Sequence, residues 1–272
     1  MLTHRVVCLR QRPSFFIALR YILVAFFIYL PAHVWTKAQY WQVEVVSTLP
    51  HDTKAFTQGL VVVGHFLYES TGLYNHSSLR KIDLRDGKVV EQYNLPSNYF
   101  AEGLAYDHGR IVQLTWREGV AFEYALEPIR PIRTLRYQGE GWGLCTHQAA
   151  FWMSDGSAIL KRRQFPTFEV DKRLVVQLQG RKMERLNALA CVEDCIYANV
   201  WQKEQILCIN LEGEVIAIID ASQLLTHAQK QLLDRDGVLN GIAYRAATKT
   251  FFLTGKNWPT LFEVRFVPQS KE

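Results

Sequence analysis

Short runs in which apolar and polar residues alternate recur along most of the chain. Examples are LRKIDLRDG at residues 79–87, VAFEYAL at 120–126 and LFEVRFV at 261–267. Alternation with a period of two residues is typical of β-strands that bury one face. Asp-Gly and Glu-Gly pairs follow several of these runs and suit tight hairpin turns. The pattern therefore predicts an all-β fold made of consecutive hairpins.

One phrase of the sequence occurs five times, as FTQGLVV, FAEGLAY, EGWGLCT, RLNALAC and VLNGIAY. The small residues at the centres of the five copies are Gly59, Gly103, Gly143, Ala188 and Gly241, which are 44, 40, 45 and 53 residues apart. A repeat of this length is typical of propeller blades, each of which is a four-stranded sheet. We therefore expect a five-bladed β-propeller, in which the central small residues let five strands crowd the axis.

The fifth repeat ends before its fourth strand. The segment YWQVEVVSTLP, residues 40–50, precedes the first repeat without a partner. We expect it to supply the missing outer strand, so that the N-terminal strand closes the ring and covers an exposed sheet edge. A doubly wound α/β fold is disfavoured because strands and helices do not alternate regularly.

The longest spacing, before the last repeat, contains the segment ASQLLTHAQKQLLDRDG, residues 221–237. Leu224, Leu225, Ala228 and Leu232 would share one face of a helix, and Asp220 precedes it as a candidate cap. The pattern predicts one short surface helix inserted before the last blade.

The first 38 residues differ from the rest of the chain. Arg5, Arg10, Arg12 and Arg20 precede the apolar run YILVAFFIYLP, and residues 1–38 contain no acid. This is the pattern of an export signal. Extending the apolar stretch back through SFFIAL approaches membrane-spanning length, so an uncleaved anchor is the alternative. In both cases the basic flank predicts that residues 39–272 lie across the membrane, in a bacterial periplasm.

The net charge changes once this leader is set aside. The whole chain carries +5, but residues 1–38 hold five Lys and Arg, which leaves 26 basic against 26 acidic residues. A neutral folded part has no basic face of the kind that binds a phosphate backbone. We therefore expect no nucleic-acid partner. We also expect the protein to be a monomer.

Four cysteines remain after the leader: Cys145, Cys191, Cys195 and Cys208. In an oxidising compartment Cys191 and Cys195, in CVEDC, could form a disulfide across a hairpin turn. Free cysteines in the core are the alternative. No second Cys/His pair accompanies CVEDC at ligand spacing, so we expect no zinc site.

The residues that precede the five small centres should recur around one rim of the central channel. They are Gln58, Glu102, Trp142, Asn187 and Asn240. Trp116, Trp201 and Lys256 end the second strands of three repeats and should overhang the same mouth. An aromatic wall with few convergent polar groups is the usual form of a small-molecule site. The mouth of the channel is therefore the candidate site, with Glu102 as its carboxylate.

These motifs resemble the plant and bacterial type of glutaminyl-peptide cyclotransferase, a family of five-bladed propellers. The resemblance rests on FTQGL, FAEGL, GEGWGL, LNAL followed by ANVW, and LNGIAY followed by FFLTGKNWP, and covers roughly residues 42–266. It implies conversion of an N-terminal glutamine of a peptide or protein to pyroglutamate with release of ammonia.

The resemblance also implies the roles of the site residues. It places the catalytic acid/base at Glu102. It places the substrate pocket at Phe56, Gln58, Phe100, Trp116, Trp142, Asn187, Trp201, Asn240 and Lys256. A single carboxylate could take a proton from the α-amine and return it to the departing ammonia. Asn187, Asn240 and Lys256 are candidate donors to the oxyanion of the tetrahedral intermediate.

No cofactor is expected. A structural calcium is suggested by plant relatives, but no ligand set in this sequence predicts it. Two other functions fit the repeats: a non-catalytic periplasmic propeller that binds peptide N-termini through the same pocket, and a scaffold that uses blade edges. Glu102 together with Lys256 favours the enzyme.

Overall fold

The computed structural model describes residues 37–269, and these residues are built almost entirely of β-strands. The expected signal or anchor therefore lies almost wholly outside the described residues. None of the helices among the described residues is long and apolar enough to cross a membrane.

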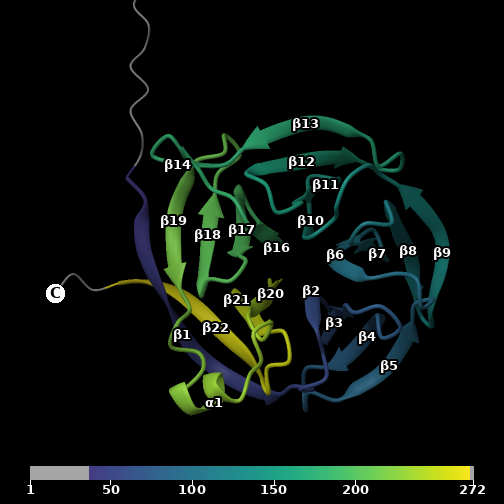
Figure 1. The fold of residues 1–272 in the computed structure, drawn as a ribbon, viewed down its shortest axis with the longest axis horizontal. Coiled ribbons are helices and arrows are strands. Elements are labelled where there is room, and N and C mark those ends of the chain that lie inside the picture. Colours follow the sequence, from purple (N-terminus) through teal and green to yellow (C-terminus); the bar gives the residue numbers. More distant parts are fainter. Residues whose placement is uncertain (1–36, 270–272) are drawn as a thin grey trace, which may run out of the picture. The chain divides into compact units, whose positions relative to one another are not determined.

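Three antiparallel sheets of four strands each follow the chain in order (Figure 1). The first contains β2 (Thr57–Val63), β3 (Phe66–Thr71), β4 (Ser78–Asp83) and β5 (Val89–Asn94). The second contains β6 (Ala101–Asp107), β7 (Arg110–Thr115), β8 (Val120–Leu126) and β9 (Ile129–Arg136). The third contains β10 (Leu144–His147), β11 (Ala150–Met153), β12 (Ile159–Gln164) and β13 (Val170–Val175). Each of the three is a meander of consecutive hairpins.

The remaining long strands form one eight-stranded sheet. In spatial order it contains β16 (Leu186–Val192), β17 (Cys195–Val200), β18 (Gln205–Ile209), β19 (Val215–Asp220), β1 (Gln39–Pro50), β22 (Thr260–Pro268), β21 (Thr250–Gly255) and β20 (Leu239–Arg245). β1 pairs antiparallel with β22 along most of its length, and its first four residues pair in parallel with β19. A two-stranded ladder of β14 (Gln177–Leu178) and β15 (Arg181–Lys182) lies between the third sheet and β16 in sequence.

The innermost strands meet around a common centre (Figure 1). β2 contacts β6, β6 contacts β10, β10 contacts β16, β16 contacts β20, and β20 contacts β2 again. The contacts are so close that a Cβ on Gly59 would lie 2.6 Å from the backbone nitrogen of Leu104, and one on Gly103 would lie 2.6 Å from that of Leu144. The glycines at the centres of these repeats are therefore required by close backbone approach.

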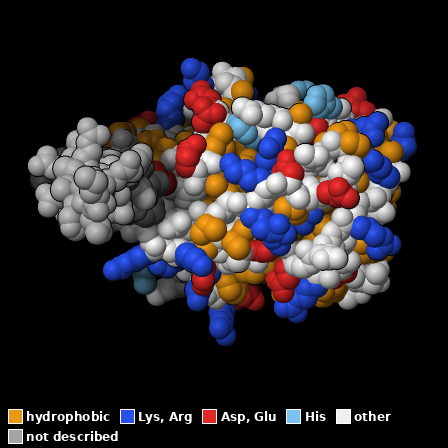
Figure 2. Space-filling view, turned by 90° about the horizontal axis from the view of Figure 1, so that it is seen from above, with side chains coloured by type: hydrophobic (Ala, Val, Ile, Leu, Met, Phe, Trp, Pro, Cys, Tyr) orange, Lys and Arg blue, Asp and Glu red, His pale blue; other side chains and the backbone are white. Residues whose placement is uncertain are grey.

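The apolar core lies between neighbouring sheets. One cluster joins Leu60 and Leu67 of the first sheet to Ala243 and Phe252 of the eight-stranded sheet, and equivalent clusters fill the other gaps between sheets. Lys and Arg side chains are interspersed with Asp and Glu on the face shown in Figure 2. This mixture agrees with the balanced charge of the chain outside its leader.

The helix differs from the one expected. α1 covers only His227–Gln231, and none of its residues is buried. Its cap is Thr226, whose hydroxyl accepts from the backbone N–H of Gln229 at 3.2 Å. Asp220 instead accepts from the backbone N–H of Ser222 in the turn after β19. Leu224 and Leu225 are buried ahead of the helix, whereas Leu232 is 87% exposed, so the predicted helical face does not form.

The cysteine pairing also differs from the expectation. The hairpin at CVEDC is present, but the disulfides join Cys145 to Cys191 and Cys195 to Cys208. Val192 pairs with Cys195 and Cys191 pairs with Ile196, so Cys191 and Cys195 lie on opposite faces of the hairpin. A Cys191–Cys195 disulfide is therefore wrong, and so is the alternative of free cysteines.

Candidate active site

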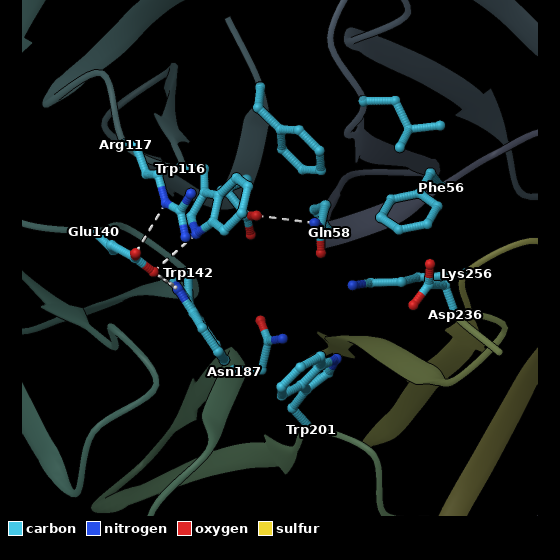
Figure 3. A pocket seen from close by; sticks show the side chains of 13 residues that line it. Phe56, Gln58, Trp116, Arg117, Glu140, Trp142, Asn187, Trp201, Asp236 and Lys256 are labelled. Atoms are coloured by element: carbon cyan, nitrogen blue, oxygen red, sulfur yellow. Dashed lines mark hydrogen bonds and ion pairs between the residues drawn. The ribbon is translucent and has the colours of Figure 1, made fainter.

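A cavity of about 450 Å³ opens at the end of the channel where four of the inner strands begin (Figure 3). Its lining consists of aromatic rings with a small set of charged and amide groups between them. The lining residues are Phe56, Gln58, Leu73, Phe100, Glu102, Trp116, Arg117, Glu140, Trp142, Asn187, Trp201, Asp236 and Lys256.

Nine of the ten residues that the sequence indicated line this cavity, and Asn240 does not. Leu73, Arg117, Glu140 and Asp236 line it without having been predicted. Arg117 directly follows Trp116 and Glu140 precedes Trp142 by two residues, so a charge close to a predicted tryptophan was an available signal. Leu73 and Asp236 come from loops and carried no such signal. Trp258, two residues after Lys256, is 1% exposed and packs in the core.

The strand pairing is irregular at four of the polar rim residues. The ladders between the first and second strands skip residues at Gln58, at Glu102, at Asn187 and at Asn240. Each skip falls at the second residue of its inner strand. Irregularities of this kind release a residue from the ladder and reorient its side chain. The same local irregularity therefore frees all four polar side chains from the regular alternation, and those of Gln58, Glu102 and Asn187 line the cavity.

A chain of hydrogen bonds connects three of these groups. The Asn240 Nδ2 donates to the backbone oxygen of Thr57 at 3.1 Å and to Gln58 Oε1 at 2.8 Å. Gln58 Nε2 then donates to Glu102 Oε1 at 2.9 Å. The backbone carbonyl of Thr57 can only accept, so it fixes the direction of the whole chain. As a result the N–H of Gln58 faces the carboxylate of Glu102.

Glu102 is 5% exposed, and its environment favours the neutral acid. Burial raises the pKa of Glu102 well above the usual 4.5, Lys256 opposes this shift, and the negative charges of Glu140 and Glu118 add to it. Carboxyl groups with a raised pKa are suited to exchange protons near neutral pH. Glu102 is therefore placed to accept and release a proton.

Lys256 follows β21 directly and lines the same cavity as Glu102, with its side chain beside Phe56 and Asp236 (Figure 3). Its backbone N–H donates to Val238 at 2.9 Å, and its Nζ lies 4.6 Å from the centre of the Phe56 ring. Burial lowers the pKa of Lys256, whereas the charges of Glu102 and Asp236 oppose that shift. Lys256 is 7% exposed and brings a cation into an otherwise largely aromatic wall.

Asn187 offers an unused acceptor to the cavity. Its Oδ1 is buried and has no hydrogen-bond partner within the described part of the chain. A buried polar atom without a partner is costly and is usually matched by a ligand or a water molecule. Asn187 therefore carries an unsatisfied acceptor at the wall of the cavity.

Aromatic rings form the wall of the cavity. Phe56 and Phe100 have ring centres 6.1 Å apart, Phe100 and Trp116 5.4 Å, and Trp142 and Trp201 5.7 Å. Space for Trp142 depends on Gly156, because a Cβ there would lie 2.7 Å from the Trp142 ring. Within residues 37–269, no three His, Cys, Asp or Glu side chains gather in a way that could hold a metal ion.

Comparison with known proteins gives consistent results. A family model described as glutamine cyclotransferase matches residues 20–266. The glutaminyl-peptide cyclotransferase of Arabidopsis thaliana is 37% identical over 227 residues, which are 82% of this chain and 71% of that protein. The crystal structure of Myxococcus xanthus glutaminyl cyclase is similar with a TM-score of 0.81 and 38% identity, and the match covers 86% of this chain and all of that one.

Proposed function

This chain belongs to the glutamine cyclotransferase family, and we propose that it acts through the cavity around Glu102. It is a transferase that converts the N-terminal glutamine of peptides or proteins to pyroglutamate and releases ammonia. The single observation that carries the assignment of the site is the buried carboxylate of Glu102, which lines a largely aromatic cavity together with Lys256 and interacts with its charge.

Glu102 acts first as the general base. The neutral α-amine of the substrate attacks the carbon of its own γ-carboxamide, and its nitrogen must give up one proton to Glu102 as the new C–N bond forms. A free N-terminal amine has a pKa of about 8, so a carboxylate with a raised pKa is a better partner than an ordinary one. The hydrogen bond from Gln58 holds the Glu102 carboxylate and stabilises its ionised form, which is the form that accepts the proton.

Glu102 acts next as the general acid. Attack of the amine forms the five-membered ring and a tetrahedral intermediate that carries negative charge on the former amide oxygen. The C–N bond to the leaving nitrogen then breaks, and the proton held on Glu102 moves to that nitrogen, which leaves as ammonia. One carboxylate thus completes the proton balance without a second acid.

Lys256 and Asn187 stabilise the oxyanion. The Lys256 ammonium supplies charge, and the amide N–H of Asn187 supplies a hydrogen bond, while the free Oδ1 of Asn187 accepts from a substrate N–H. Loss of one such oxyanion donor costs about 3 kcal/mol of barrier in other enzymes. Asn240 has no free N–H for this role, because its Nδ2 already donates to the Thr57 carbonyl and to Gln58 Oε1. We therefore assign Asn240 the orientation of Gln58.

The aromatic wall binds the glutamine side chain. Trp116, Trp142 and Trp201 line the same cavity as Glu102 and Lys256, and with the substrate bound they cover its side chain and exclude water from it. Cyclisation is already intramolecular, so the enzyme gains rate by holding the side chain folded back on its own amine. A binding protein for peptide N-termini would need the wall but not the buried acid, and it is not favoured by the family relationship.

We infer that the fold is a five-bladed propeller in which β1 serves as the outer strand of the last blade. The closed order of contacts among β2, β6, β10, β16 and β20 supports five blades, and the antiparallel pairing of β1 with β22 supports closure by the N-terminal strand. A chain that lacks residues 39–50 should then lose cooperative unfolding, and retention of a wild-type melting transition would argue against this closure.

We also propose that the enzyme works without a metal and is exported as a monomer. The basic, acid-free leader supports export to the periplasm, either as a cleaved signal or as an anchor. Cell fractionation with N-terminal mass spectrometry tests the export, and light scattering tests the monomer. A cytoplasmic protein or a stable dimer would contradict the respective proposal.

The direct test of the activity is ammonia release from a peptide that begins with glutamine, measured on the purified domain with and without a chelator. We expect full activity in the chelator and none on the same peptide beginning with asparagine. Loss of activity in the chelator that returns with added metal would refute metal independence. No activity from folded protein would refute the proposed reaction.

A further inference from the structure

The ring contacts along the aromatic wall of the cavity leave a gap between Trp116 and Trp142. Ring contacts join Phe56 to Phe100, Phe100 to Trp116, and Trp142 to Trp201. Within residues 37–269 no ring contact joins Trp116 to Trp142, although both line the cavity. These two residues come from different repeats. Because their rings do not pack against each other, ring packing does not set the distance between them.

The carboxylate of Glu140 spans this gap (Figure 3). Its Oε2 accepts from the indole N–H of Trp116 at 2.8 Å and from that of Trp142 at 2.9 Å. One oxygen atom therefore joins the two halves of the wall. Each indole N–H is a donor with a single direction, so both rings are oriented by the same acceptor.

Arg117 holds Glu140 in this position. Its Nε donates to Glu140 Oε1 at 3.0 Å, and its guanidinium carbon lies 3.6 Å from the centre of the Trp116 ring. Burial alone would raise the pKa of Glu140, but hydrogen bonds from Trp142, Trp116 and Arg117 outweigh it and lower the pKa. Both oxygens are thus used, and Glu140 stays ionised as an acceptor.

We propose that Glu140 is a positioning residue that sets the spacing of Trp116 and Trp142 for the glutamine side chain by accepting both indole N–H groups. It makes no covalent bond and moves no proton. This inference rests on the proposed function of the cavity as the glutamine site. It assigns a specificity-determining role to a carboxylate that lies outside the proton-transfer path.

A second carboxylate separates this role from a general effect of charge. Glu118 also raises the pKa of Glu102 through its charge, as Glu140 does. Its Oε1 accepts from the Tyr74 hydroxyl at 2.8 Å, and it does not line the cavity. Replacing Glu118 therefore removes a similar charge and leaves the two indoles untouched, which makes Glu118→Gln the matched control.

The experiment compares Glu140→Ala and Glu140→Gln with Glu118→Gln in steady-state kinetics on a peptide that begins with glutamine. Both Glu140 variants should raise KM, by about tenfold for Glu140→Ala because two charge-assisted hydrogen bonds are lost, and kcat should change much less. Glu140→Gln keeps one acceptor oxygen and should raise KM less. Glu118→Gln should leave KM unchanged. Equal KM values for the Glu140→Ala and Glu118→Gln proteins would overturn the proposal.

A readout that does not need activity keeps this test separate from the test of the proposed function. The indole ¹H–¹⁵N resonances of Trp116 and Trp142 can be assigned with the single variants Trp116→Phe and Trp142→Phe. Both resonances should shift in Glu140→Ala and stay in place in Glu118→Gln. If the two resonances do not shift in Glu140→Ala, the role of Glu140 is overturned, even when the wild-type enzyme is active. If they shift in Glu140→Ala but the wild-type protein has no activity, only the proposed function is refuted.

Discussion

Gln58 and Glu102 lie on neighbouring inner strands, and a buried hydrogen bond of 2.9 Å joins Gln58 Nε2 to Glu102 Oε1. Asn240, from the last repeat, fixes the orientation of Gln58 by donating to its Oε1 at 2.8 Å. The acid is therefore held by a directed chain of amides from two other repeats. The equivalent positions of three repeats thus hold an acid, the amide that donates to it and the amide that orients that donor.

The amide chain should control the pH dependence of the reaction. Gln58→Leu removes the donor to the carboxylate, and loss of a hydrogen bond to the charged form raises a carboxyl pKa further. The acid limb of kcat/KM should therefore move to higher pH. Asn240→Leu should move it in the same direction by a smaller amount, because Gln58 then has no fixed orientation. If the acid limb of kcat/KM lies at the wild-type pH in both variants, the amides do not control the pKa of Glu102.

A buried pair beside the active site should make stability depend on pH. His51 Nε2 lies 2.8 Å from Glu69 Oε1, and His51 Nδ1 lies 2.7 Å from the backbone oxygen of Trp258, in the loop that carries Lys256. Burial would lower the pKa of His51, but Glu69, the Trp258 carbonyl and Asp52 together outweigh it and raise that pKa above 6.5. Burial would raise the pKa of Glu69, but His51, Thr57 and Arg80 outweigh it and lower that pKa below 4.5.

The signs of these two shifts define the window. The stabilisation from protonated His51 is complete below pH 6.5 and is lost as pH rises through its raised pKa. The stabilisation from ionised Glu69 is complete above pH 4.5 and is lost as pH falls through its lowered pKa. Urea melts should show the highest stability from pH 4.5 to 6.5. His51→Gln should flatten the alkaline side of this profile. An alkaline side that keeps its wild-type slope in His51→Gln would refute the role of the pair.

Gly156 should be required for the position of Trp142. Gly156 and Gly109 both have a φ of +82°, but a Cβ on Gly109 would meet nothing within 4 Å. Both Gly156→Ala and Gly109→Ala should lose about 1 kcal/mol of stability from the strained backbone. Only Gly156→Ala should also raise KM, because its Cβ would displace the indole. A KM increase in both, or in neither, would show that the contact with Trp142 is unimportant.

The two disulfides should contribute unequally to stability. The Cys145–Cys191 bond joins the inner strands β10 and β16 across 46 residues, and Cys195–Cys208 closes 13 residues within one sheet. Loop-closure entropy predicts losses of about 4 and about 3 kcal/mol when the respective pairs are replaced by serine. Non-reducing peptide mapping checks the pairing, and denaturant unfolding checks the order. Recovery of a peptide that contains a Cys191–Cys195 disulfide would contradict the pairing.

The repeat made most of the site predictable from sequence. Because every copy of the phrase places the same position at the start of an inner strand, Gln58, Glu102 and Asn187 could be placed together without a structure. The repeat did not distinguish groups that face the cavity from groups behind it. Asn240 occupies the equivalent position, yet the nearby Thr57 carbonyl draws its amide away from the cavity.

Other features depended on contacts that the pattern does not contain. The cysteine pairing follows from the hairpin register, which spacing alone does not specify. The start of α1 was marked by the capping box of Thr226 and Gln229, but apolar spacing favoured an earlier start. Glu140 was missed because its function is to bind two side chains from different repeats, and such a bridge appears only once both are placed in space.

The role of Glu102 is tested most directly by ammonia release from a glutamine-initiated peptide by the Glu102→Gln protein, with Glu118→Gln as the control. Glutamine matches the size of Glu102 but cannot take up or return the proton. We expect a wild-type melting temperature and a loss of activity of at least about a thousandfold, whereas Glu118→Gln stays active. A Glu102→Gln protein that cyclises its substrate at near the wild-type rate would show that the acid/base lies elsewhere.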